Sequence, residues 1–312
     1  MTKAPGTSPE SVRGLGPMTA AALVFGSSAA VLVVELAALR LLAPYLGLTL
    51  ETSTIVIGIA LAAIATGSWA GGRAADIMPP RRALGPLLAV SGVAVAATPN
   101  LVRAAGETGG SGAALLMAIV AILVPGALLS AVSPMVTKLV LTDLAETGSV
   151  VGRLSGIGTV GAIAGTVLTG FVFLAALPVS SVLVATGVLL VLAAAAVEVR
   201  VRGIRAAVLP LVLLVPGALG AAYGPGRCEA ETVYHCAQVQ TDPARESGRV
   251  LVLDSLRHSY VDLDDPTHLE FQYVQALAGV ADTAFPAGGP LEAYHLGGGG
   301  LTFPRYLERV RP

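Results

Sequence analysis

The chain has 312 residues, of which 54% are hydrophobic and only 12% are charged, and its mean hydropathy is +0.77. Soluble globular domains carry about 25% charged residues, so the composition excludes an ordinary soluble protein. The formal net charge of -1 gives no overall field that would attract nucleic acid, and we expect no nucleic-acid partner. The composition therefore predicts that the lipid bilayer is the main partner of this chain.

Seven apolar runs follow a polar N-terminal stretch, residues 1–17, for which we expect a disordered tail. A helix that crosses the hydrocarbon core of about 30 Å needs roughly 20 apolar residues. Residues 18–223 are expected to form a transmembrane domain on this criterion. The expected spans are residues 18–42, 53–70, 83–102, 113–136, 150–176, 179–199 and 204–222.

Basic residues gather in alternate loops, which predicts a multi-pass protein of the plasma membrane. These residues are Arg73, Arg81 and Arg82 after the second run, Lys138 and Arg153 after the fourth, and Arg200, Arg202 and Arg205 after the sixth. The positive-inside rule places these loops and the N-terminal tail in the cytoplasm. Seven spans then put residues 224–312 outside, which we favour. If the seventh run, which contains Pro210 and Pro216, does not span, they lie inside.

The first run contains two charged residues, Glu35 and Arg40, which lie roughly 140° apart around a helix and do not fully neutralise each other. A charge at membrane depth costs about 2.5–3.5 kcal/mol on insertion scales, which makes it a functional hypothesis. The alternative, which we favour, is structural. In that case Arg40 extends to the interface and Glu35 pairs with another helix.

Small residues and prolines in the later runs indicate close helix packing. Four-residue glycine spacings occur at Gly152 and Gly156 and again at Gly161 and Gly165. Such faces let helix backbones approach closely in lipid, within one chain or between copies in an oligomer. The alternative is a transport route, for which Pro125 and Pro134 would break the fourth run beside a cavity.

Charged residues return after residue 223, and residues 224–312 are expected to form a separate domain. Residues 232–240 and 250–253 are predicted to form a hairpin joined by a polar turn. Asp265 is the expected N-cap of a helix over residues 266–278. Residues 291–296 are predicted to form a buried strand. Cys228 and Cys236 do not form a CxxC pair, so we expect no metal site; a local disulfide and two free thiols both stay open.

Four consecutive glycines, Gly297, Gly298, Gly299 and Gly300, follow the expected strand. A strand, a glycine turn and a helix start together form a nucleotide site, because glycine lets a ligand approach the backbone and the helix N-terminus offers free N–H groups. The spacing differs from GxGxxG, and the Lys-Ser/Thr pair of a P-loop is missing. An ordinary tight turn is the alternative.

The segment LVLDSLRHSYVDLDDPTHLEFQY, which precedes this loop, resembles the entry segment of spermidine synthases. The matching residues are Leu251, Leu253 and Asp254, then Glu270, Phe271 and Tyr273, then Gly297, Gly298 and Gly299. The spans also resemble those of bacterial fused MFS/spermidine synthases, through VELAALRLLAPYLG, GSWAGGRAAD and GRLSGIGTVGAIAGTVLTG. The resemblance covers nearly the whole chain.

The resemblance implies the start of a Rossmann-like α/β domain of the methyltransferase and spermidine synthase type. It implies aminopropyl transfer from decarboxylated S-adenosylmethionine, held at the glycine loop, to a polyamine or another small amine, with no tightly bound cofactor. S-adenosylmethionine is the alternative cosubstrate, in which case the chain resembles a methyltransferase. The substrate-binding candidates are His235, Asp254, His258, Glu270 and Tyr273.

The departures from the family pattern concern the same site. Gly300 stands where the family has an acidic residue, and His235, His258 and Val274 stand where it has glutamines. The catalytic aspartate of the family would lie beyond Pro312, so we expect a fragment that is inactive alone. A second hypothesis is a membrane transporter or scaffold that carries a non-catalytic adenosyl-binding-like module.

Overall fold

The computed structural model describes residues 16–47, 49–107, 111–141, 144–208, 211–212, 228–232, 234–286 and 289–311. The chain divides into two compact units. One contains residues 1–41 and 49–224, and the other contains residues 42–48 and 225–312.

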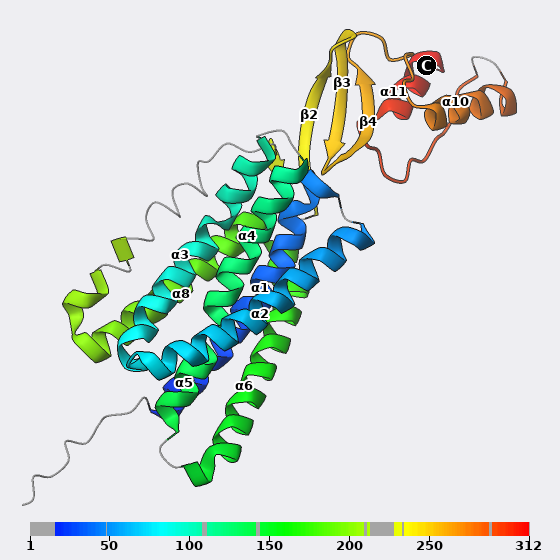
Figure 1. The fold of residues 1–312 in the computed structure, drawn as a ribbon. Helices are drawn as coiled ribbons and strands as arrows, with labels where there is room; N and C mark the ends of the chain where they lie inside the picture. Colours follow the sequence, from blue (N-terminus) through cyan, green and yellow to red (C-terminus); the bar gives the residue numbers. More distant parts are fainter. Residues whose placement is uncertain are drawn as a thin grey trace, which may run out of the picture. The chain divides into compact units, whose positions relative to one another are not determined.

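The first unit is a bundle of long helices (Figure 1). Its helices are α1 Pro17–Leu46, α2 Leu50–Ile77, α3 Pro80–Glu107, α4 Ser111–Ser130, α5 Val132–Val140, α6 Thr147–Leu168, α7 Leu174–Ala176 and α8 Val179–Arg202. A π-helical turn, Thr169–Phe173, joins α6 to α7. Within the described residues, six helical segments are long and apolar enough to cross a membrane. They coincide with six of the seven expected spans, whereas residues 209–210 and 213–222 of the seventh lie outside the described residues.

Glycine brings the helix backbones into contact. A Cβ atom on Gly161 would lie 2.3 Å from the Phe25 carbonyl oxygen of α1, and one on Gly165 would lie 2.5 Å from that of Ala29. No larger side chain fits at either position, so this half of the predicted glycine face does pack. Gly152 and Gly156 have no neighbour within 4 Å of such a Cβ, and their predicted role in an oligomer stays a prediction.

The fourth expected span is interrupted, but at only one of the two predicted prolines. Pro125 lies inside α4, whereas α4 ends at Ser130 and α5 begins at Val132, just before Pro134. Proline is tolerated in the first turn of a helix but has no N–H to bond the carbonyl four residues earlier. The Ser130 carbonyl therefore receives no bond from residue 134, and the helix breaks at this point.

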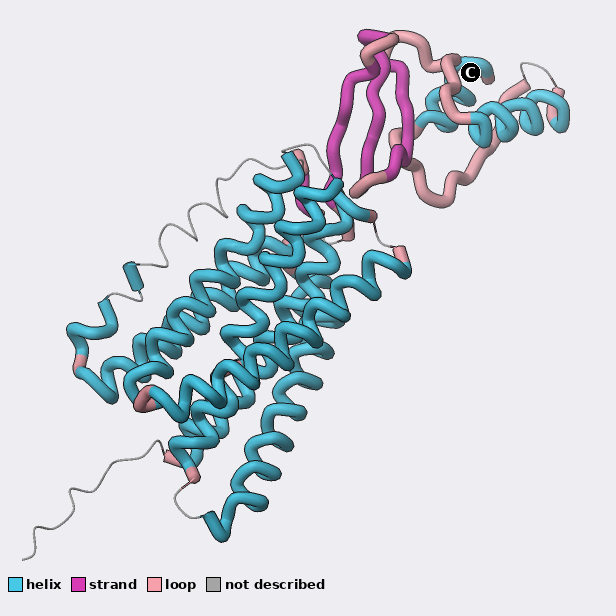
Figure 2. Tube along the Cα trace, viewed as in Figure 1, coloured by secondary structure: helices cyan, strands magenta, loops and turns pink. Residues whose placement is uncertain are grey.

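The second unit contains an antiparallel sheet in the order β1-β2-β3-β4 and two helices (Figure 2). The elements are β1 Ala230–Glu231, β2 Cys236–Asp242, β3 Arg245–Leu253, β4 Leu256–Asp262, α10 Gln272–Ala284 and α11 Thr302–Val310. Inward residues alternate with outer ones along β3, as a half-buried strand requires. The resulting core consists of Val250, Val252 and Tyr260, with Phe271 packed against it.

Three local predictions in this unit are wrong. The hairpin turn is shorter than expected, because β3 begins at Arg245 and its polar residues still pair with β2. The strand β4 was not predicted. The helix begins at Gln272 rather than at residue 266, because the Asp265 carboxylate instead accepts the Thr267 N–H in a turn. Residues 291–296 form no strand: Leu296 is 89% exposed.

The Rossmann-like sheet is not present among the described residues, whose strands pair only antiparallel. A buried parallel strand needs paired neighbours and a covered face. Nothing in the described part of the chain supplies these to residues 291–296.

Candidate functional site

Asp254 and His235, two of the predicted binding residues, contact each other at the turn between β3 and β4. The Asp254 carboxylate lies 2.6 Å from His235 Nδ1 and accepts the Cys236 N–H at 2.9 Å. Asp254 has a φ of 57°, a left-handed conformation that aspartate tolerates because its side chain bonds locally. Both oxygens of this carboxylate therefore serve the turn, which favours a structural role for it.

A disulfide joins Cys228 to Cys236 beside this pair, within the part of the chain that the structure describes. The sequence left a disulfide and two free thiols open, and the structure contains the disulfide. It fixes the stretch before β2 to the buried Cys236 on the first residue of that strand. Bonds of this kind persist in oxidising compartments.

Glu270 and Tyr273 lie near each other at the start of α10. Glu270 forms an ion pair with Arg257 at 3.6 Å, and its other carboxylate oxygen lies 3.6 Å from His268 Nε2. The Arg257 guanidinium also lies 5.4 Å from the centre of the Phe271 ring, which in turn contacts Tyr273. Tyr273 is exposed, so its ring and the Glu270 carboxylate are open to a solute. Arg257 and His268 were not among the predicted residues.

His258 is the extra residue of a β-bulge. Leu251 pairs with Ser259 and Val252 with Arg257, so that His258 on β4 has no partner in the register. Its side chain is exposed and makes no hydrogen bond or ion pair with the described residues. Bulges redirect side chains and occur next to active sites, which keeps His258 as a candidate.

The glycine loop lies against β4. The Gly300 N–H donates to the Ser259 hydroxyl at 2.7 Å, and the Thr302 hydroxyl donates to the Tyr260 carbonyl at 2.6 Å. A Cβ on Gly300 would lie 2.6 Å from a Val261 methyl carbon, so the position without an acidic residue is closely packed. Gly297 and Gly299 adopt φ values of +74° and +51°, which other residues rarely adopt.

Opposite faces of β4 meet the glycine loop and the Glu270 group. Cross-strand partners share a face, so Tyr260 and Arg257 lie on the face of Val250 and Val252. Ser259 and Val261, which contact the glycine loop, lie on the other face. The structure therefore does not bring the loop together with Glu270 in one site.

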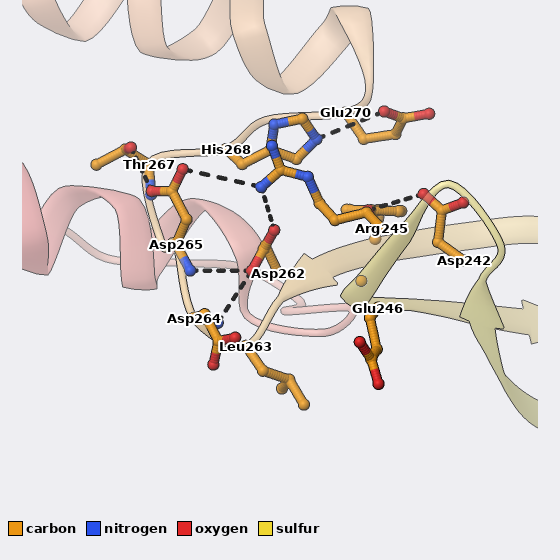
Figure 3. Close-up of polar contacts among 12 residues, drawn as sticks. Asp242, Arg245, Glu246, Asp262, Leu263, Asp264, Asp265, Thr267, His268 and Glu270 are labelled. Carbon is orange, nitrogen blue, oxygen red and sulfur yellow. Dashed lines mark hydrogen bonds and ion pairs between the residues drawn. The ribbon is translucent and has the colours of Figure 1, made fainter.

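A network of charged residues that the sequence analysis did not identify lies at the end of the hairpin (Figure 3). Arg245 donates to the buried Asp262 carboxylate at 2.5 Å, and the other oxygen of Asp262 accepts the N–H groups of Asp264 and Asp265. Arg245 is the main cause that holds the pKa of Asp262 well below its usual range. Both oxygens of the Asp262 carboxylate are therefore hydrogen-bonded within the protein, which favours a structural role over binding of a ligand.

Tyr260 connects this network to the core. Its hydroxyl donates to Asp242 at 2.9 Å, and burial, followed by this carboxylate, raises the pKa of Tyr260 to about 12. The acidic repeat of residues 262–265 was a visible signal for the network. Its partner Arg245 could not be identified without the strand register. Among the described residues, no group of three or more His, Cys, Asp or Glu side chains is placed to hold a metal ion.

Comparisons of the chain with protein-family models, with curated proteins and with solved structures found no match. The site must therefore be interpreted from its own geometry.

Proposed function

We propose that the chain is a multi-pass protein of the plasma membrane whose C-terminal unit binds an adenosyl cosubstrate, in the manner of an aminopropyltransferase. Decarboxylated S-adenosylmethionine is the proposed cosubstrate, and a polyamine or another small amine is the proposed acceptor. The observation that carries the proposal is the backbone of the glycine loop. Gly297, Gly298 and Gly299 are exposed, and Gly300 and Leu301 separate them from the start of α11.

The loop geometry supports binding of a ligand to the backbone. Gly297 has no neighbour within 4 Å of a Cβ position, which leaves its backbone open to an adenosyl ligand, and its positive φ is strained for any other residue. The Gly298 carbonyl accepts the Leu301 N–H at 2.7 Å and so holds the turn. Glu270, although paired with Arg257, is the exposed acid that would attract an amine. Because β4 separates the two groups, an amine at Glu270 would not lie beside a cosubstrate at the loop, so the proposal for this chain is binding of each compound and not transfer between these two positions.

Binding of the cosubstrate to the full chain tests this function. The chain in lipid nanodiscs would be titrated calorimetrically with decarboxylated S-adenosylmethionine and with S-adenosylmethionine. We expect the decarboxylated form to bind, and Gly297→Ala to weaken binding about tenfold, because the strained position costs about 1–2 kcal/mol. Gly279→Ala, on the open face of α10, is the matched control and should bind as the unmodified chain does.

Two other results of this titration would contradict or change the proposal. Binding that is unchanged in Gly297→Ala, or absent for both compounds, would contradict the proposal. If the chain binds S-adenosylmethionine more tightly and transfers its methyl group, the proposed function becomes that of a methyltransferase instead of an aminopropyltransferase.

The disulfide favours a second candidate function. Adenosyl cosubstrates are cytoplasmic, whereas the Cys228–Cys236 bond is typical of an oxidising compartment. A unit on the outer side would be a non-catalytic module of a membrane transporter or scaffold. Intact cells would be treated with a reductant that opens the disulfide and then with a thiol reagent that does not cross the membrane. This experiment distinguishes an external C-terminal unit from a cytoplasmic one. Labelling of Cys228 and Cys236 supports the second function, and protection supports the first.

A further inference from the structure

A pocket of about 270 Å³ lies between α1, α2, α4, α5 and α6 and is open at the side where Ser68 and Ser155 are exposed. Half of its lining residues carry a hydroxyl group, and the others are apolar. The hydroxyl residues are Ser27, Ser28, Ser68, Ser130, Ser133, Ser155 and Thr159. No charged side chain is part of this lining.

Most of these hydroxyls have no hydrogen-bond partner within the described part of the chain. Helical Ser and Thr usually donate to a carbonyl one turn earlier, as Thr66 does to Ala62 at 2.7 Å and Thr137 does to Ser133 at 2.9 Å. In the pocket, only Ser27 and Thr159 do so. The other five make no hydrogen bond with any described residue. At membrane depth such groups are costly to leave unsatisfied, which indicates that the pocket holds a polar guest.

The helix break adds a backbone acceptor to the same wall. Ser130 and Ser133 line the pocket on either side of the interruption between α4 and α5. Because Pro134 has no N–H, the Ser130 carbonyl lacks the helical bond that residue 134 would otherwise make. Broken helices of this kind supply ligand-binding groups near the middle of membrane proteins.

Glu35 places a negative charge on the α1 face that lines the pocket. It lies seven residues after Ser28 and three after Leu32, both lining residues, and therefore continues their face by one turn. Helical side chains incline toward the N-terminus, which is the direction of the pocket from Glu35. Its carboxylate has no ion-pair or hydrogen-bond partner among the described residues, so the expectation that it pairs with another helix is wrong there.

The chemistry of these groups defines the guest. Hydroxyl oxygens, a carbonyl freed by proline and an unpartnered carboxylate together favour a cationic donor of hydrogen bonds. The volume far exceeds the roughly 30 Å³ of one water molecule, and Val31, Leu32 and Ile64 supply an apolar wall. We propose that the pocket binds a small primary alkylammonium ion, with its ammonium group on Glu35 and the hydroxyls and its alkyl chain on this wall. The proposal does not depend on the glycine loop.

Binding of radiolabelled n-butylamine to the full chain in phosphatidylcholine nanodiscs tests the proposal, with empty nanodiscs as the blank. At neutral pH the amine is protonated, since alkyl ammonium groups titrate near about pH 10. We expect saturable binding that Glu35→Gln weakens at least about tenfold, because the counter-charge is lost. Glu146→Gln is the matched control, since Glu146 is exposed outside the pocket. It should bind as the unmodified chain does.

Two further arms keep the test decisive if Glu35→Gln does not fold. Glu35→Asp keeps the charge and should retain most of the binding. The double variant Ser130→Ala/Ser133→Ala should weaken it about threefold relative to Ser149→Ala, whose hydroxyl lies outside the pocket. Equal binding by Glu35→Gln and Glu146→Gln, or by the two serine variants, would overturn the proposal. So would equally effective competition by neutral n-butanol, or displacement of the amine by an equal concentration of sodium.

Discussion

The contacts that stabilise the helical bundle differ in kind from those that stabilise the C-terminal unit. In the bundle, α6 meets α1 where Gly161 and Gly165 have no side chains, so that backbone touches backbone. In the C-terminal unit, Val250, Val252 and Tyr260 form a buried cluster on the sheet, and Arg245 and Asp262 pair at the end of the hairpin. Lipid offers no hydrophobic drive between helices, so close fit must supply the attraction there. Water around the sheet permits charged contacts to contribute.

This difference predicts which perturbation each unit resists. Side-chain volume added at the α1–α6 contact should destabilise the bundle and leave the sheet unchanged, whereas a change of pH or the loss of a charge at the Arg245–Asp262 pair should do the reverse.

The largest effect is expected for Gly161→Leu. The new side chain would begin 2.3 Å from the Phe25 carbonyl oxygen, so α1 and α6 must separate. We expect a loss of about 3 kcal/mol or more, measured as a lower thermal midpoint of the detergent-solubilised chain. Gly152→Leu on the same helix meets open space and is the control. Equal losses in both variants would show that backbone contact at Gly161 does not hold the helices.

The next largest effect is expected for Asp262→Asn, which leaves Arg245 without its buried partner. Because the pKa of Asp262 is lowered in the folded unit, the unfolded chain takes up a proton first as the pH falls. This stabilisation is complete above about pH 4 and is lost as the pH falls through the lowered pKa. The variant should be less stable at neutral pH and lack that acid-dependent loss.

Near-ultraviolet circular dichroism follows this unit, since six of the seven tyrosines lie in it. Asp264→Asn, at an exposed neighbour, is the control. An acid transition that is unchanged in Asp262→Asn would show that the acid-dependent loss of stability does not come from Asp262.

A smaller effect is expected when the disulfide is removed by Cys228→Ser/Cys236→Ser. Closing so short a loop restricts the unfolded chain, so its loss should cost about 2 kcal/mol. Amide hydrogen exchange of β2 and β3 measures this cost, and the exchange of α3 and α8 serves as the internal control. Acceleration in the bundle helices as well would contradict the independence of the two units.

The smallest effect is expected for Tyr260→Phe, which removes the bond to Asp242 and should cost about 1 kcal/mol. The raised pKa of Tyr260, about 12, means that the unfolded chain loses the phenolic proton first as the pH rises. This stabilisation is fully present below about pH 10 and is lost as the pH rises through the pKa of Tyr260 in the folded unit. The pKa of Tyr306 is also raised, by burial and by its bond to Asp282. Ultraviolet titration should therefore show late-titrating tyrosines, of which the component near about pH 12 disappears in Tyr260→Phe but not in Tyr273→Phe. Its persistence in Tyr260→Phe would assign it elsewhere.

The amino-acid sequence by itself determined the spans and part of the packing. Hydrophobic length decides where a helix can cross a bilayer, so six runs were predicted close to their observed positions. Gly161 and Gly165 were predicted to pack because small residues at that spacing have few other uses in lipid. The break near Pro134 followed from the missing N–H of proline.

Only the tertiary structure decided the remaining features, because each depends on residues far apart in the chain. The register of β3 and β4 places His258 in a bulge and puts the glycine loop and the Glu270 group on opposite faces of β4. The pairing of Arg245 with Asp262 requires the strands to be aligned first. In the bundle, hydroxyls from five helices converge on one pocket, and no local sequence pattern predicts such a convergence.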